Sequence, residues 1–154
     1  MAQTIQDYTI NQLEISQGLS FDENTPIEQV LNAMRERKVS CVVCTTQGKI
    51  SGVLTERDVF LKIAGQDIDW QLPVSSFVTV NPVTLDHEAP LKKALYLMGK
   101  NSFRHIPIVN DSGALVGVLS IQDVVVHIAE HFPEEVLNLP PKLHQVATKP
   151  EGGK

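Results

Sequence analysis

The residues best suited to chemistry form two short motifs with one pattern, GVLTERD at 52–58 and GVLSIQD at 117–123. Each places an aspartate three positions after a hydroxyl residue. By itself this spacing is a variant of a helix capping box and predicts only a helix start. The free N–H groups there also attract phosphate, and a nearby carboxylate can accept hydrogen bonds from ribose hydroxyls. Because the motif occurs twice, at the same place in both units, a ligand-binding role gains weight beside the capping role.

Two other patterns are weaker candidates. Cys41 and Cys44 form a C-x-x-C in a β-branched run, and residues three apart on a strand face opposite sides, so we interpret both as buried small hydrophobes. His127 and His131 match the H-x-x-E-H of inverted zinc peptidases, but we expect solvated histidines near a terminal helix. We predict no metal site, no catalytic residues and no enzymatic activity.

The two motifs belong to a repeat of about 60 residues, which appears when the sequence is shifted by 64 and then 65 positions. The matched pairs are Pro26 with Pro90, Leu31 with Leu95, Met34 with Met98, Gly48 with Gly113, Gly52 with Gly117, Thr55 with Ser120, and Asp58 with Asp123. The matches keep their order along the chain, so coincidence is a poor explanation.

Each unit carries the same succession of expected elements. An apolar stripe at helical spacing begins after Thr25, the expected N-cap, with Pro26 at the first helical position. Strands are expected at 39–45 and 103–109 and, after a turn, at 50–54 and 115–119, each pair followed by a helix. A short first strand is expected near 19–21 or 80–85. The predicted fold is α+β, two β-α-β-β-α units with three-stranded sheets.

The predicted organisation has four parts. They are an N-terminal extension at 1–14, the first repeat at 15–68, the second repeat at 69–132 and a mobile, Pro- and Lys-rich tail at 133–154. The net charge of −5 and the scattered Lys and Arg argue against a nucleic-acid partner. No apolar run reaches the length of a membrane span and the N-terminus lacks a signal-peptide pattern, so we expect a cytoplasmic protein.

The two motifs, together with Phe103-Arg104-His105-Ile106-Pro107, resemble the CBS domain family over roughly residues 15–130. The resemblance implies two repeats packed about a pseudo-twofold axis into a Bateman module with two clefts. It assigns Asp58 and Asp123 to ribose, with Thr55 and Ser120 helping with ribose or phosphate.

The resemblance also implies the remaining contacts of the clefts. Arg104 and His105 face phosphate, while Ile106 and Val42, with the backbone near Thr79, line the adenine. Pro107 belongs to the same strand. In the first repeat Ser40 and Cys41 stand where the second has Arg104 and His105, which puts the equivalence of the two sites in doubt.

The predicted function is a non-catalytic, energy-sensing regulatory module that binds AMP, ADP or ATP, without a required metal although Mg²⁺ can accompany ATP. It would signal to a separate, unknown partner and form a homodimer. Two alternatives stay open: a structural dimerisation module with empty clefts, and a sensor of another adenosine ligand such as S-adenosylmethionine or NAD.

Overall fold

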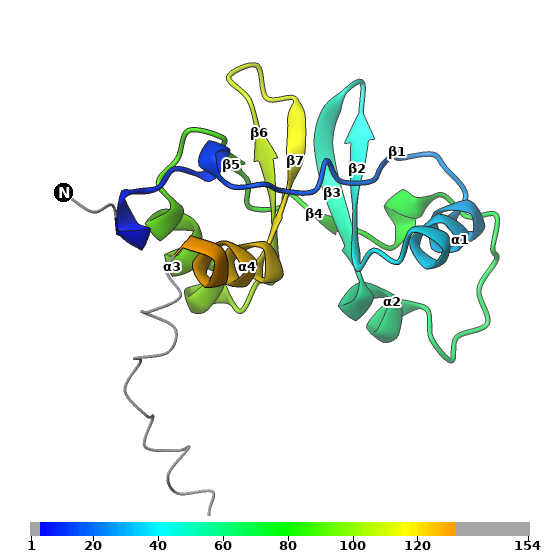
Figure 1. Cartoon of the computed structure of the whole chain (residues 1–154). Helices are drawn as coiled ribbons and strands as arrows, with labels where there is room; N and C mark the ends of the chain where they lie inside the picture. The colour runs from blue at the N-terminus through cyan, green and yellow to red at the C-terminus, as the bar shows by residue number, and fades with distance from the viewer. Residues whose placement is uncertain (1–3, 132–154) are drawn as a thin grey trace, which may run out of the picture.

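The computed structural model describes residues 4–131, and the order of its elements repeats (Figure 1). The first half contains β1 (Ser20–Asp22), α1 (Ile27–Arg37), β2 (Cys41–Thr46), β3 (Lys49–Thr55) and α2 (Glu56–Lys62). The second half contains β5 (Leu85–Asp86), α3 (Leu91–Asn101), β6 (His105–Val109), β7 (Leu115–Ser120) and α4 (Ile121–His131). The predicted α+β fold with two β-α-β-β-α units is confirmed. The mobile tail predicted at 133–154 lies outside the described residues.

The two sheets share one design but differ in the strand that extends them. In the described part of the chain, the order is β1-β2-β3-β4 in the first sheet, where β4 (Thr79–Val80) comes from the linker, and β5-β6-β7 in the second. The first sheet is therefore four-stranded, and the prediction of three strands was wrong for it. In the second half Ser16 forms a bridge with Val118 of β7, so an outside segment lies along this edge too.

The glycine of each motif makes room for that outside segment. A Cβ on Gly52 would lie 2.7 Å from Val78 Cγ2 and 3.0 Å from the Thr79 carbonyl oxygen. A Cβ on Gly117 would lie 2.5 Å from the Ser16 carbonyl oxygen. Both glycines are thus required by the close approach of another backbone, an arrangement that the motif alone did not reveal.

Helix α1 begins differently from the expectation. Thr25 makes no side-chain cap, and Pro26 is the N-cap residue. Instead, the linker after α2 supplies backbone acceptors: Ile27 N–H donates to the Leu72 carbonyl at 2.8 Å and Glu28 N–H to the Trp70 carbonyl at 3.1 Å. The free N–H groups of a first helical turn need acceptors, and here tertiary packing provides them.

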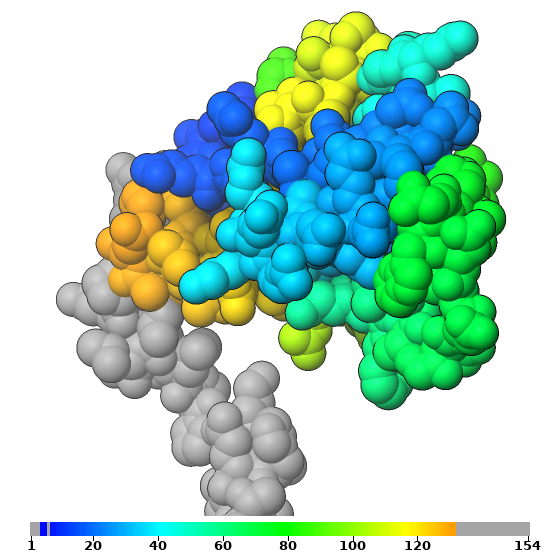
Figure 2. Space-filling model, turned by 90° about the vertical axis from the view of Figure 1, so that its right-hand side faces the viewer, coloured from blue at the N-terminus to red at the C-terminus, as the bar shows by residue number. Residues whose placement is uncertain are grey.

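Each half has its own aliphatic core, and the N-terminal segment completes the second one. Ile10 and Leu13 are buried with residues of α3, β6 and α4, so the segment expected as an extension packs as part of the second half. Figure 2 shows this blue segment between the yellow strands and the orange α4. No helix within residues 4–131 has the length and apolar character needed to cross a membrane.

A third apolar cluster joins the halves where the sheets face each other. It contains Cys41 and Val43 of β2 and Val118 of β7, whereas Cys44 is buried in the core of the first half. The two cysteines are free and face opposite sides of β2, as the sequence predicts.

Candidate functional site

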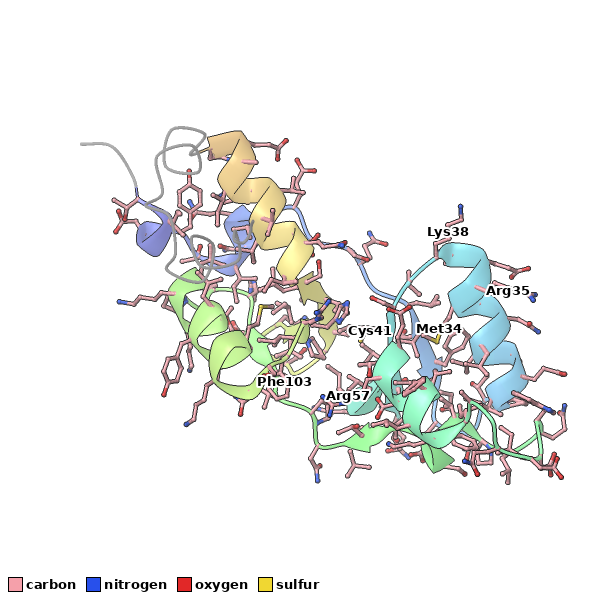
Figure 3. The ribbon with its side chains drawn as sticks, turned by 90° about the horizontal axis from the view of Figure 1, so that it is seen from below. Met34, Arg35, Lys38, Cys41, Arg57 and Phe103 are labelled. Atoms are coloured by element: carbon pink, nitrogen blue, oxygen red, sulfur yellow. The ribbon has the colours of Figure 1, made fainter. Side chains whose placement is uncertain are left out.

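A cleft of about 470 Å³ lies between the halves and gathers most of the predicted site residues. Those lining it are Ser40, Cys41, Thr55, Asp58, Thr79, Arg104, His105 and Pro107. The motif of the first half thus faces the β6 strand of the second half, and Figure 3 shows Arg57 and Phe103, two further lining residues, on its opposite walls. The size suits a small ligand, since such pockets span roughly 300–1,000 Å³.

The motif of the first half builds the start of α2. Thr55 is the N-cap, and Asp58 N–H donates to Thr55 Oγ1 at 3.3 Å while Thr55 N–H donates to Asp58 Oδ2 at 3.0 Å. The two side chains therefore form a complete capping box, and the capping role expected from the sequence is present.

The Asp58 carboxylate has partners beyond this box. Its Oδ2 also accepts the Thr55 hydroxyl at 3.1 Å, and its Oδ1 accepts the Thr79 hydroxyl at 3.0 Å and lies 3.1 Å from Lys62 Nζ. Burial raises the pKa of Asp58, but the hydrogen bonds from Thr55, Lys62 and Thr79 outweigh it and hold this pKa below its usual value. The group is an ionised carboxylate at neutral pH that is 7% exposed.

The motif of the second half caps α4 in the same way but has fewer contacts. Ser120 N–H donates to Asp123 Oδ2 at 2.9 Å, and Asp123 N–H donates to Ser120 Oγ at 3.0 Å. Within residues 4–131 the Asp123 carboxylate accepts no other donor and forms no ion pair. Neither residue lines the cleft described above. The structure thus keeps the two predicted ribose carboxylates in separate places.

The β6 segment brings basic groups to the cleft. Arg104 is exposed and, in the described part of the chain, has no carboxylate partner within 4.0 Å. His105 Nε2 lies 2.9 Å from Ser40 Oγ, a hydrogen bond between the two halves. Burial lowers the pKa of His105, Glu56 and Asp123 oppose this shift, and Arg104 adds to it. At neutral pH His105 is therefore an uncharged hydrogen-bonding group, and the positive charge at this wall comes from Arg104.

Two predicted adenine contacts are placed elsewhere by the structure. Val42 is 1% exposed in the core of the first half, and Ile106 is fully buried in the core of the second. Because side chains alternate along a strand, neighbours of the cleft residues Cys41 and His105 must face the other way. The side chains of Val42 and Ile106 therefore do not line the cleft, and the expectation for them needs this correction.

Other lining residues were not identified from the sequence. Arg57 and Glu56 lie inside the motif itself, and Leu61 follows Arg57 by one helical turn, so periodicity could have revealed all three. Phe103 directly precedes the predicted Arg104. In contrast, no local signal marks the linker residues Asn81, Pro82 and Val83, which only the tertiary fold brings to the cleft.

The histidines of the H-x-x-E-H pattern are not both solvated. His127 is 5% exposed, its ring lies 4.5 Å from that of Tyr8 and it stacks on His131 at 4.2 Å between centroids. His131 Nδ1 hydrogen bonds to the His127 carbonyl. The expectation of solvation was wrong for His127, because the N-terminal segment covers it.

Comparison with known proteins gives one consistent result. The family model described as CBS domain matches residues 14–65 and 74–130. The CBS domain-containing protein YhcV of Bacillus subtilis is 30% identical over 112 residues, which are 73% of this chain and 79% of the relative. An uncharacterized 17.7 kDa protein of Acidianus ambivalens is 30% identical over 116 residues, 75% of this chain and 70% of its own.

Among solved structures, a CBS domain protein from Pyrobaculum aerophilum complexed with AMP is 26% identical with a TM-score of 0.69, covering 80% of this chain and 99% of its own. The CBS domain pair of the protein MJ0100, solved with 5′-methylthioadenosine and S-adenosylmethionine, has a TM-score of 0.70 at 16% identity and covers 80% and 97%.

Proposed function

The chain belongs to the CBS domain family, and from this premise we propose that it is a non-catalytic regulatory module that binds an adenine nucleotide and signals to a separate partner. The observation that carries the proposal is the composition of the cleft. One wall offers Thr55 and Asp58 at a helix start, and the opposite wall offers Arg104. A carboxylate for a ribose and a free guanidinium for a phosphate suit the two polar ends of a nucleotide.

Apolar side chains at the same cleft suit the base. Leu61, Val83 and Phe103 lie along its walls, and Leu61 is 59% exposed at the surface. A flat adenine ring would shield these side chains from water. Similar proteins solved with AMP or with S-adenosylmethionine support an adenosine ligand.

Thermal unfolding and calorimetric titration with a panel of AMP, ADP, ATP, S-adenosylmethionine, NAD and GTP test the proposal. A ligand that binds only the folded state stabilises it by about 2.7 kcal/mol at a hundredfold excess over its Kd. We expect at least one adenosine compound to raise the Tm by several degrees, and GTP to do less. No binding by any adenosine compound would contradict the proposal.

A structural dimerisation module with empty clefts is the second candidate. The saturated Asp58 carboxylate favours it, because this group already serves within the fold. Phe60 on α2 and Val125 on α4, 65 positions apart, are 72% and 59% exposed. Apolar residues at pseudo-equivalent positions suit the self-complementary surface of a twofold homodimer. We propose this dimer for both candidates, and light scattering of wild type and Phe60→Ser tests it.

The wider setting completes the proposal. The acidic balance of the chain, with a net charge of −5, argues against a nucleic-acid partner. We place the module in the cytoplasm, where adenine nucleotides vary with energy state, and expect the regulated protein to be a separate chain. Affinity capture with and without ATP would identify a partner whose binding depends on the nucleotide.

A further inference from the structure

Lys62 contacts the same Asp58 carboxylate that is proposed to bind the ribose of a ligand. Its ammonium lies 3.1 Å from Asp58 Oδ1 and donates a hydrogen bond to the Phe77 carbonyl at 2.9 Å. The residue lies at the last position of α2, one turn after Asp58. Lys62 therefore ties the proposed ribose carboxylate to the backbone that leads into β4.

The carboxylate of Asp58 has no acceptor capacity left in this state. An ionised carboxylate offers about four lone-pair sites. Four donors already occupy them: the Thr55 N–H, the Thr55 hydroxyl, the Thr79 hydroxyl and Lys62 Nζ. A ribose diol brings two more donors, so it can bind Asp58 only if a protein donor leaves.

Lys62 is the donor that can leave at the smallest cost. Its side chain is 38% exposed, so the ammonium can move into water, where it is well solvated. Thr55 forms the capping box of α2 with its side chain and its backbone N–H, so displacing it would disturb a helix start. The Thr79 hydroxyl can turn without leaving the site and accept a hydrogen bond from the ligand, whereas the Lys62 ammonium can only donate and must leave.

We propose that Lys62 is a built-in competitor for the ligand at this cleft, and that a ligand with a ribose diol binds Asp58 by displacing the Lys62 ammonium. The inference rests on the proposed nucleotide function and adds a specificity determinant to it. A ligand without a full diol gains less from the exchange, so Lys62 selects for an intact ribose.

The test is calorimetric titration of adenosine and 2′-deoxyadenosine into wild type and Lys62→Met, with Lys93→Met as the matched control. Lys93 is an exposed lysine on α3, so this control removes the same charge away from the cleft. We expect Lys62→Met to bind adenosine at least threefold more tightly, with a smaller gain for 2′-deoxyadenosine and no gain for Lys93→Met. Amide shifts of Thr79 would locate the binding at this cleft.

The outcomes separate the inference from the function. Adenosine binding at this cleft that is unchanged or weaker in Lys62→Met overturns the inference alone. Absence of binding by both proteins, to adenosine and to every adenosine compound of the panel above, overturns the proposed function and the inference with it. If Lys62→Met loses cooperative unfolding, Lys62→Gln replaces it, since its amide can still donate to the Phe77 carbonyl but carries no charge to hold Asp58.

Discussion

The two motif aspartates occupy equivalent positions but have different surroundings. One turn after Asp58 stands Lys62, which contacts it, and one turn after Asp123 stands His127, which packs on Tyr8 and His131 instead. Opposite the motif strand, the Thr79 hydroxyl donates to Asp58, whereas Ser16 Oγ accepts the Gly18 N–H. The two halves share a fold, but their motif aspartates have different partners, because those partners are supplied by residues outside the motif.

Two strands that line the cleft, β2 and β6, differ in the same way. Cys41 pairs with Thr55 in the first sheet, and His105 pairs with Ser120 in the second. Cys41 and His105 therefore occupy equivalent positions in the two halves. Burial, with a smaller contribution from Asp58, raises the pKa of Cys41 to about 12, so this thiol stays neutral. The second half instead provides Arg104 beside His105. The two halves therefore share the backbone plan but differ in the polar side chains that it carries.

The largest expected effect is a loss of stability when a side chain is added at the two motif glycines, where another backbone lies close. Gly117→Ala should destabilise the protein by about 1–3 kcal/mol, because its Cβ would meet a backbone oxygen that cannot rotate away. Gly52→Ala should cost less, because its Cβ would lie 3.0 Å from the nearest backbone oxygen, that of Thr79, and its closest contact at 2.7 Å is a side-chain methyl of Val78. Urea unfolding measures both. Gly99→Ala is the control, since no atom lies within 4 Å of its added Cβ and the change should be neutral or stabilising. An equal loss of stability in Gly52→Ala and Gly117→Ala would contradict the predicted difference between the two halves.

The next effect compares the two carboxylates. Asp58→Ala should weaken binding of the best adenosine ligand tenfold or more and also lower apo stability by about 1–2 kcal/mol, because Lys62 and Thr79 lose their acceptor. Asp123→Ala should cost less apo stability, because within residues 4–131 its carboxylate accepts one donor, the Ser120 N–H. Titration and urea unfolding of the free proteins test the pair. If the protein with both Asp58→Ala and Asp123→Ala binds the ligand with wild-type affinity, the two aspartates serve only as helix caps.

A smaller effect concerns the phosphate. Arg104→Ala should lower the affinity for AMP or ATP about threefold to tenfold while leaving adenosine nearly unchanged. Among the described residues its guanidinium has no acidic partner, so it is available to bind phosphate. Lys100→Ala on α3 controls for the lost charge. Equal losses for adenosine and AMP would mean general damage to the cleft and would end the division of roles between its walls.

The smallest effect is a pH dependence carried by His105. Its pKa is lowered in the folded state, so the unfolded chain binds more protons and stability falls as pH drops below about 6.5. Between pH 8 and 7 this residue should contribute no change. His105→Gln should reduce the loss between pH 6.5 and 5.5 in urea unfolding, because Gln does not titrate and can still bond to Ser40. An unchanged pH profile in this variant would refute the assignment.

Much of the fold was predictable because it depends on local rules. The hydroxyl-x-x-Asp spacing predicted the starts of α2 and α4, and the turn glycines with β-branched runs predicted β2–β3 and β6–β7. Thr25 failed as a cap because carbonyls of the distant linker took its place. Val42 and Ile106 were assigned to the adenine by the family resemblance, but strand alternation turns their side chains into the cores.

The sequence by itself determined the repeat, the capping boxes and the alternation of β2 and β6, since each depends on neighbours within a few residues. Only the tertiary structure decided that Thr79 and Lys62 saturate Asp58, that Ser16 crosses Gly117 and that Ser40 reaches His105. These contacts join segments from separate elements or depend on side-chain geometry within the packed cleft. The Lys62 pair has a helical i,i+4 spacing that the sequence contains, whereas the other distances follow from how separate segments and, for Ser40 and His105, the two halves pack together.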